Sequence, residues 1–588
     1  MNGRLPRIAP RLLAAAIVSL AAVVAQETKP SGLAYLTPAE INRSLRALVD
    51  KAAPKARIVS LGRSLGGEEI LAVEIGRTKK DEMPADASGP KRRQWGKVAA
   101  VLVVAGLEGE RVLGTAIAHD VVRRALALDD RAFDQAFETQ HLYVVACVDP
   151  DGAARSLQAG PGQAERGNAR VLDRDRDGKS REDTADDLDG DGLCVAMRVR
   201  DPKGDLVPDP DNPRRLRGAD LAKGERGLFK LFPEGKDDDL DRSHNEDGGG
   251  GVLVNRNFPH GWAENDPESG AYPSSEPESK ALLDYVLARK NIACALILGA
   301  HDNLVAVPDA AKDEGGGERR RGRPPAVKPH ADDRERMLEI AKVYKELTKN
   351  ETRGSGDDRG AFHHWLYFQF GIPTFACNPF EVSEDAAADK APESAPASAP
   401  ATSQPESRPA PTDDEILAAA AASIRNNGFV PWHGADHPTL GKVEIGGWRP
   451  NVRTRPDAGA AAILAARHYA FVLALVERRS ELLLEDVVVE KRGEGLFHIG
   501  ATVVNKGFWP TALVQGVANR VTGNVIVELS LPEESLLHGA RRRSFDRLRE
   551  KAGAERVEWL VRADSGAKVG ILVSPPKCAA FVTEVTLP

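Results

Sequence analysis

Cysteine is scarce in this sequence, neither sign of charge dominates it, and long apolar runs are rare. Five Cys among 588 residues exclude a small protein held together by disulfides. With 80 Lys and Arg against 87 Asp and Glu, the formal charge is only −7, so no positive excess argues for a nucleic-acid partner. Beyond the N-terminal segment, no run is expected to be apolar enough to span a membrane. At roughly 150 residues per domain, the length predicts more than one domain.

Residues 1–25 have the order of features that is typical of a secretory signal peptide. Arginines precede an apolar run from Leu12 to Ala25, and small residues end that run before Gln26. The run is shorter than the ~20 residues of a comfortable membrane span. We therefore expect a secreted or periplasmic mature protein, with an uncleaved N-terminal anchor as the alternative.

The cysteines do not require disulfides even in an exported protein. Cys147, Cys294 and Cys377 each lie in a short apolar run that predicts a buried strand, where cysteine behaves as a small apolar residue. Cys194 and Cys578 remain as a possible pair, which the sequence leaves open.

Apolar runs alternate with helical patterns through most of the chain. Strands are predicted at 98–106, 140–148, 293–301 and 372–377, and helices at 112–128, 332–348 and 458–478. A further helix is expected to begin at a capping box formed by Ser275 and Glu278. This alternation predicts an α/β fold with a mostly parallel sheet.

Two regions depart from the alternating pattern. A Pro/Ala/Ser tract at about 383–412 lacks the large apolar residues that offset the entropy of ordering, so it predicts a disordered insertion. From about 483 to 588, short β-rich runs broken by Gly, Asn and Pro predict a separate C-terminal all-β sandwich.

Several motifs occur in one order along the α/β part. They are VDPDG at 148–152, VLVNRNFPHGW at 252–262, YPSSEPESKAL at 272–282, a strand that ends at His301, and FHHWLYFQFGIPTF at 362–375. In this order the sequence resembles the zinc carboxypeptidases of the carboxypeptidase A/B type, here over a domain of residues 26–480. The resemblance implies an α/β/α sandwich around a mixed sheet, with one zinc at the carboxyl ends of the strands.

The resemblance also implies a zinc site of two His and one Glu, and this sequence departs from it. The first His position holds Glu108, the Glu position holds Arg111, and only the third position, His301, is retained. Arginine stays protonated and has no lone pair to donate to a metal. Zinc is therefore expected in the family but not here. His301 is then either a weak metal ligand or a residue hydrogen-bonded to Glu108.

The hydrolytic groups are altered as well. The family's general-base position holds Asn378, with Glu381 as a weak substitute, and the substrate-capping Tyr position holds Gly356. By contrast, Asn255 and Arg256 match the residues that bind the substrate's terminal carboxylate. Arg256 is equally compatible with a salt bridge to neighbouring acids.

These observations leave two main hypotheses for function. The first is a non-catalytic relative that binds peptides, including cell-wall peptides, or other carboxylate-ended ligands. The second is an active metallocarboxypeptidase with a metal site rebuilt from Glu108, Glu110 and His301. No nucleic-acid partner is expected in either case.

An acidic insertion lies at about 166–248. Alternating carboxylates followed by glycine suit Ca²⁺, which needs several oxygen ligands; the candidates are Asp173, Asp175, Asp177, Asp187, Asp189 and Asp191. A looser copy occurs at Asp237, Asp239 and Asp241. The twelfth positions of the first two runs are Thr184 and Arg198, so neither run is an EF-hand. Structural calcium and a solvated acidic loop both remain open.

Overall fold

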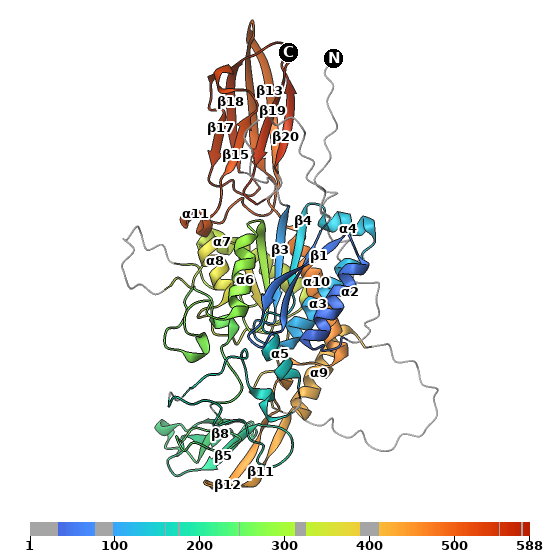
Figure 1. The fold of residues 1–588 in the computed structure, drawn as a ribbon. Coiled ribbons are helices and arrows are strands. Elements are labelled where there is room, and N and C mark those ends of the chain that lie inside the picture. The colour runs from blue at the N-terminus through green and yellow to red at the C-terminus, as the bar shows by residue number, and fades with distance from the viewer. Residues whose placement is uncertain are drawn as a thin grey trace, which may run out of the picture.

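The computed structural model describes residues 33–76, 98–158, 160–174, 177–245, 247–311, 325–387, 411–551, 553–577 and 580–588. The expected signal peptide, Cys578, Asp175 and most of the Pro/Ala/Ser tract lie outside these ranges. The described chain forms three parts arranged in a row: a C-terminal all-β module, a central α/β body and a smaller sheet at the opposite end (Figure 1).

The central body is built on a mixed sheet of six strands in the order β1-β2-β4-β3-β9-β10. The strands are β1 Ala56–Arg63, β2 Glu69–Ile75, β3 Ala99–Ala105, β4 Gln140–Val145, β9 Ile292–Leu298 and β10 Thr374–Cys377. The four strands from β4 to β10 pair in parallel, whereas β1 and β2 are antiparallel to their neighbours. The strands predicted at 98–106, 140–148, 293–301 and 372–377 are the parallel ones, as their continuous apolar runs indicate.

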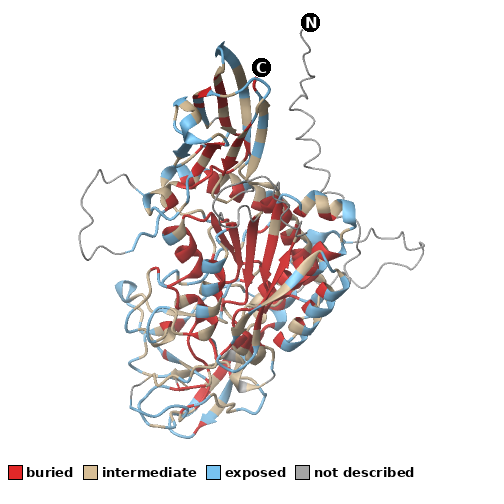
Figure 2. Ribbon diagram, turned by 45° about the horizontal axis from the view of Figure 1, so that its top comes forward, coloured by how far each residue is buried: buried red, intermediate tan, exposed pale blue. Residues whose placement is uncertain are grey.

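Helices cover both faces of this sheet. The helices of the central body are α2 Pro38–Lys51, α3 Val112–Ala127, α4 Asp130–Phe137, α5 Pro150–Leu157, α6 Pro277–Ala288, α7 Ala331–Thr348, α8 Phe362–Phe370, α9 Asp413–Asn427 and α10 Ala458–Glu477. One core joins the sheet to α3, α7 and α10, and a second core on the other face joins it to α6 and α8. The buried interior follows the strands and the inner helices (Figure 2). The predicted α/β/α sandwich around a mixed sheet is confirmed.

The acidic insertion contributes strands that the sequence did not predict. Together with β11 and β12, which lie outside the insertion, they form a second six-stranded sheet in the order β11-β12-β5-β8-β6-β7. Its strands are β5 Ala196–Arg200, β6 Leu206–Pro208, β7 Leu216–Gly218, β8 Phe229–Pro233, β11 Phe429–His437 and β12 Gly441–Trp448. Strand β12 pairs antiparallel with β5 and so connects the insertion to a part of the chain outside it.

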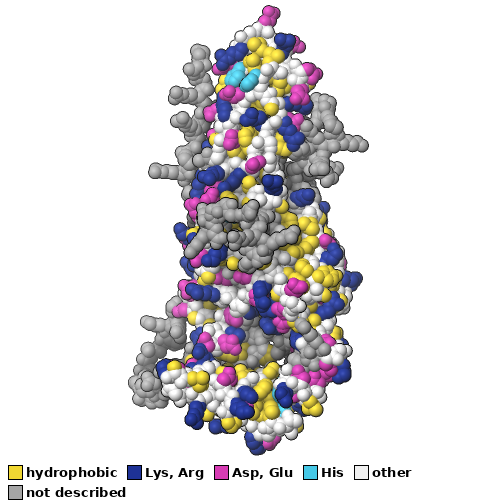
Figure 3. Space-filling view, turned by 90° about the vertical axis from the view of Figure 1, so that its left-hand side faces the viewer, with side chains coloured by type: hydrophobic (Ala, Val, Ile, Leu, Met, Phe, Trp, Pro, Cys, Tyr) yellow, Lys and Arg dark blue, Asp and Glu magenta, His cyan; other side chains and the backbone are white. Residues whose placement is uncertain are grey.

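The C-terminal module is all-β, as predicted. It has two four-stranded antiparallel sheets, β13-β14-β18-β16 and β17-β15-β19-β20, that share one apolar core. The strands are β13 Leu482–Gly493, β14 Leu496–Asn505, β15 Val525–Leu529, β16 Leu536–His538, β17 Arg542–Phe545, β18 Ala554–Arg562, β19 Lys568–Ser574 and β20 Phe581–Thr586, and a short helix α11 covers Val514–Ala518. On the face shown in Figure 3, basic and acidic side chains are interspersed, so neither sign of charge covers it.

Two local predictions were wrong. Helix α6 begins at Pro277 after Glu276, which makes no side-chain cap bond, so Ser275 and Glu278 do not form a capping box. Glu278 instead accepts the Leu65 N–H at 2.7 Å, because it is buried against the sheet. Helix α10 is long and apolar enough to cross a membrane by length and composition, contrary to expectation, but 78% of its apolar window is buried inside the protein.

The described cysteines are buried. Cys147, Cys294 and Cys377 lie in the core as predicted. Cys194 carries a free thiol that donates to the Asp186 carbonyl at 2.8 Å, and its possible partner Cys578 is outside the described residues.

Candidate functional site

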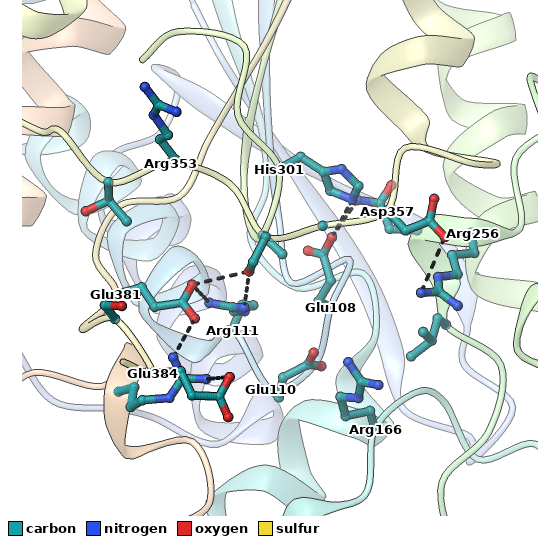
Figure 4. A pocket seen from close by; sticks show the side chains of 18 residues that line it. Glu108, Glu110, Arg111, Arg166, Arg256, His301, Arg353, Asp357, Glu381 and Glu384 are labelled. Atoms are coloured by element: carbon teal, nitrogen blue, oxygen red, sulfur yellow. Dashed lines mark hydrogen bonds and ion pairs between the residues drawn. The ribbon is translucent and has the colours of Figure 1, made fainter. Parts of the chain in front are cut away.

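A pocket of about 610 Å³ lies at the carboxyl ends of β3 and β9. Its wall is completed by η3 (Val254–Arg256), by the loop at 352–357 and by the segment that follows β10 (Figure 4). Ligand sites of open α/β sheets form at this edge, where the strands deliver their last side chains. The pocket is therefore the candidate site.

Gly106 sets the position of the first group of pocket residues. It ends β3 with φ of 63°, a left-handed conformation that favours glycine. A side chain there would approach Thr115 Oγ1 to 2.8 Å. The turn places Glu108 and Glu110 over the end of the sheet, and α3 begins directly after Arg111.

Arg111 points into the pocket and is held there by acceptors. Its guanidinium lies 2.9 Å from Glu381 Oε2 and 3.0 Å from Ser355 Oγ. Asn378 donates to the same Glu381 oxygen at 2.7 Å, and Arg453 lies 3.3 Å from the other oxygen. Burial acts to raise the pKa of Glu381, but the charge and hydrogen bond of Arg111, together with Asn378 and Arg453, outweigh it and leave the pKa below its usual value. A charge-assisted pair therefore occupies this wall of the pocket.

His301 lies between two carboxylates. Its Nε2 is 3.2 Å from Glu108 Oε1, and its Nδ1 is 2.9 Å from Asp358 Oδ1. Burial acts against the charged ring, but the bonds to Asp358 and Glu108 prevail and raise the pKa of His301 to about 9. Burial likewise acts to raise the pKa of Glu108, yet His301 brings it below its ordinary value. The site therefore holds an imidazolium at neutral pH. The expected His301–Glu108 contact is present.

Asn255 and Arg256 both line the pocket, but their polar atoms already bond within the protein. Asn255 donates to Glu108 Oε1 at 2.6 Å and accepts the Phe362 N–H at 2.9 Å. Arg256 forms ion pairs with three acids, with distances of 3.0 Å to Glu268, 3.5 Å to Asp266 and 3.6 Å to Asp357. The salt-bridge alternative for Arg256 is thus observed, and its role toward a ligand stays a prediction.

Two arginines of the pocket were not predicted from the sequence, and they lie with Glu110, a candidate for the rebuilt metal site. Arg166 and Arg353 are exposed at the pocket, and neither has an ion-pair partner among the described residues. Glu110 has a buried Oε2 without a hydrogen-bond partner in the same part of the chain, and burial together with Glu108 raises its pKa. Arg166 lies beside Glu110 (Figure 4). The two arginines have no motif around them, so only the fold reveals their position.

The residues present do not fit the family's zinc. Of the three ligand positions, only His301 offers a nitrogen lone pair, and its proton is stabilised by carboxylates on both sides. Arg111 can donate no electron pair, and its fixed charge would repel a cation. Gly356, at the expected Tyr position, packs so closely that a Cβ there would lie 2.7 Å from the His301 ring.

A different group has metal-ligand chemistry. His301, Asp358 and His363 each offer one atom, and these atoms lie within 4.8 Å of one another. His363 is buried, and burial lowers its pKa, so its ring is neutral. Neither Asp358 nor His363 was predicted, because Asp358 belongs to no motif and the FHHW segment was used only for the family resemblance.

The calcium candidates of the insertion do not form one site. Asp187 accepts the N–H groups of Gly190 and Gly192, which makes it a turn residue, and Asp189 lies 2.8 Å from His433. Two acidic groups nevertheless come together with metal-like spacing: Asp187, Asp189 and Glu234 in one, and Asp183, Asp237 and Asp239 in the other.

The fold and this cleft define a carboxypeptidase-like α/β protein. A sequence model of the zinc carboxypeptidase family matches residues 41–196 and 227–385, together more than half of the chain. The chain therefore belongs to the zinc carboxypeptidase family. A second model, a domain of unknown function (DUF8731), matches residues 481–586. No curated protein matches the chain.

Solved carboxypeptidase structures match this chain with low sequence identity and low TM-scores. Bovine thrombin-activatable fibrinolysis inhibitor, solved with a tick carboxypeptidase inhibitor, is 13% identical over 58% of this chain and 86% of its own, with a TM-score of 0.34. A metallo-carboxypeptidase from Burkholderia cenocepacia is 13% identical over 74% of this chain and 67% of its own, with a TM-score of 0.30. The murein-tripeptide amidase MpaA from Escherichia coli O157 is 13% identical over 55% of this chain and 88% of its own, with a TM-score of 0.23. The family assignment rests on the family model and not on these values.

Proposed function

We propose that this protein is an exported, non-hydrolytic zinc carboxypeptidase relative whose cleft binds peptides or other ligands that end in a carboxylate. The observation that carries the proposal is the Arg111–Glu381 ion pair of 2.9 Å, which sits at the position of a zinc ligand. A cation fixed there by its own counter-ion replaces the positive charge of a metal without supplying a metal-bound water.

The general base is also compromised. Glu381 is the carboxylate nearest to the expected base position, and its oxygens are shared among Arg111, Arg453 and Asn378. A general base must hold a proton during the reaction, and efficient proton transfer needs a pKa near the working pH. The lowered pKa of Glu381 opposes this.

The remaining charges favour an anionic ligand. Arg166 and Arg353 reach the pocket without an ion-pair partner in the described chain, and Arg256 shares its charge with acids that a ligand carboxylate could displace. A guanidinium binds a carboxylate through two parallel hydrogen bonds. Peptides with a free C-terminus, including cell-wall peptides, are therefore the ligands to try first.

Binding of matched peptides tests this proposal. We expect the mature protein to bind a free-acid peptide at least ~10-fold more tightly than its C-terminal amide, by calorimetry. Arg166→Ala and Arg256→Ala should each reduce that preference. Arg226→Ala is the matched control, since Arg226 is exposed in the insertion and has no described ion-pair partner. Equal affinity for acid and amide in the native protein would contradict the proposal.

A second candidate function follows from the His301, Asp358 and His363 group. Two histidines and one carboxylate with open positions are a common metal-binding set, and the three atoms have suitable spacing. In that case the chain is an active metallopeptidase with a displaced metal. Metal bound by the native protein and lost in His363→Ala, but not in His364→Ala, would favour this alternative.

A further inference from the structure

Three cations of the cleft each have two partners, one in the rest of the central body and one in a single short segment. The segment comprises residues 355–358, and we call it the cleft loop. Arg111 illustrates the division. Its Nη1 donates to Glu381 at 2.9 Å, and its Nη2 donates to Ser355 Oγ in the cleft loop at 3.0 Å. One terminal nitrogen of this guanidinium is therefore occupied by the loop.

Arg256 has the same arrangement at another wall of the pocket. Its Nη1 lies 3.0 Å from Glu268 and 3.5 Å from Asp266, which both follow η3 in the chain. Asp357 of the cleft loop approaches the other terminal nitrogen, Nη2, to 3.6 Å. Figure 4 shows Asp357 beside Arg256, with Glu381 at the other side of the view. The loop thus supplies a partner for one nitrogen here as well.

His301 is the third case. Its Nε2 lies 3.2 Å from Glu108 after β3, and its Nδ1 lies 2.9 Å from Asp358 in the cleft loop. The cleft loop therefore places three oxygen-bearing side chains against three cations, and each cation pairs through a different nitrogen with the rest of the body. The carboxylate of a ligand bonds to cations through oxygens in the same way. The loop occupies the donors that such a ligand needs.

The cleft loop lies at the surface, whereas the cations that it contacts are largely buried. Three of its four residues are exposed, and Asp357 is partly buried. By contrast, the side chains of Arg111 and Arg256 are only 15% and 22% exposed, and that of His301 is 3% exposed. The loop therefore separates these cations from solvent.

The loop can move aside without disrupting a helix or a strand, because it contains neither. Two of its backbone N–H groups share the Ala300 carbonyl, at 2.9 Å and 3.1 Å. Asp357 also keeps a partner when it leaves Arg256, since Arg359 donates to it at 2.8 Å. The contact between Asp357 and Arg256 is the longer of the two, and it is the one that a ligand can replace.

We propose that Ser355, Asp357 and Asp358 form an internal substitute for a ligand carboxylate, which a bound ligand displaces. This inference rests on the proposed function, because it concerns the affinity of the same cleft. A guanidinium binds a carboxylate through two parallel hydrogen bonds, and the cleft loop holds one of the donors that those bonds need. Only molecules in which the loop has moved aside offer both donors, so the apparent affinity falls in proportion to their fraction. The cleft loop therefore sets how tightly the cleft binds acids.

The test compares binding of N-acetyl-trialanine, as the free acid and as its C-terminal amide, to the full mature chain by calorimetry. Asp357→Asn keeps the shape of the side chain and removes the charge that pairs with Arg256. It should bind the free acid about 5-fold more tightly than the native protein does, the factor expected for one partly exposed ion pair, with no change for the amide. Asp309→Asn is the control, since Asp309 is 82% exposed and pairs weakly with Arg334 at 3.6 Å. It should bind both peptides as the native protein does.

Two further variants locate the source of the gain. Arg359→Ala removes the second partner of Asp357, and Asp357→Asn should still raise the affinity for the free acid in that background, because the gain comes from Arg256. A gain that disappears there would assign it to Arg359 and overturn the proposal. Ser355→Ala frees the Nη2 of Arg111 without changing the charge, so it should also raise the affinity for the acid. It decides the question if Asp357→Asn fails to fold.

The outcomes separate this inference from the proposed function. A merely structural side chain would leave binding unchanged or weaken it on substitution. If the native protein prefers the acid and neither Asp357→Asn nor Ser355→Ala gains affinity, the cleft-loop proposal alone is overturned. A preference for the acid that appears only in these variants would support the cleft loop and contradict binding by the native protein. Equal affinity for acid and amide in every protein would contradict both proposals.

Discussion

His301 carries a proton where the family's histidine carries a bond to zinc. Its two ring nitrogens face Glu108 at 3.2 Å and Asp358 at 2.9 Å, and the latter was not predicted because it belongs to no motif. Together with the Arg111–Glu381 ion pair, this arrangement places two internal cations in the pocket. At the scale of residues, the site is an ion-pair network.

The network makes stability depend on pH. The pKa of His301 is raised from 6.5 to about 9, so its contribution to stability is complete below pH 6.5 and is lost as the pH rises through 9. Because one pKa unit corresponds to about 1.4 kcal/mol, the native protein should lose up to ~3 kcal/mol more stability over this interval than His301→Gln. Denaturant unfolding at pH 6.5 and 9 measures the difference.

His498→Gln is the control for this experiment, since His498 lies in β14, outside the pocket. Its pH dependence should follow that of the native protein. The same slope for His301→Gln and the native protein would show that His301 is not a charged partner of the two carboxylates.

Asn255 joins three elements of the central body. It lies on η3, donates to Glu108 after β3, and accepts the first N–H of α8. That N–H belongs to Phe362, and α8 has no side-chain cap from its own N-cap residue. Asn255, which matches a ligand-binding position of the family, therefore also has a structural role.

Asn255→Ala should cost about 2–3 kcal/mol, because the buried Glu108 carboxylate loses one of its two partners and a helix N–H loses its acceptor. Asn524→Ala removes only an exposed bond to Ser544 and should cost well under ~1 kcal/mol. Chemical denaturation of both variants compares them. Equal, small losses would mean that Asn255 does not connect these elements.

At the scale of helices and strands, part of the fold could be predicted from the sequence. The parallel strands were found because their apolar runs are continuous, and α3, α7 and α10 because their helical patterns are long. The insertion strands were missed because β6 and β7 have three residues each and β5 pairs with β12, more than two hundred residues away. From the sequence, Glu381 is only a weak candidate, because the residues after β10 can be aligned with the family's base position in more than one register.

A buried acid of α7, Asp333, is one of the contacts that attach the C-terminal module to the central body, beside the packing of Trp509 and Leu513 in the central core. Asp333, 1% exposed, accepts the N–H groups of Val514 at 2.9 Å and Gln515 at 3.1 Å, and also the Tyr367 hydroxyl at 2.9 Å. Backbones approach closely beside it, where Gly371 meets Gly516. At the scale of the whole molecule, the two family regions share a specific interface (Figure 1).

Asp333→Ala should weaken the attachment of the C-terminal module, because two backbone amides lose a charged acceptor worth about 1.5–3 kcal/mol each. Calorimetry should then show a second transition at lower temperature, and limited proteolysis should cut between 505 and 524. The neighbouring Asp332 is the control, since its side chain is 52% exposed and pairs weakly with Arg547 at 3.5 Å. A single unchanged transition in Asp333→Ala would contradict this interface.

The zinc content of the mature protein tests the account most directly. Purified protein is incubated with equimolar ZnCl₂, dialysed and analysed by mass spectrometry of the metal, with a C-terminal trimming assay in parallel. We expect far less than one zinc per chain and no release of C-terminal residues, because Arg111 and Glu381 fill the metal's place with an internal ion pair. About one zinc per chain, with peptide trimming that His301→Ala abolishes, would contradict the account.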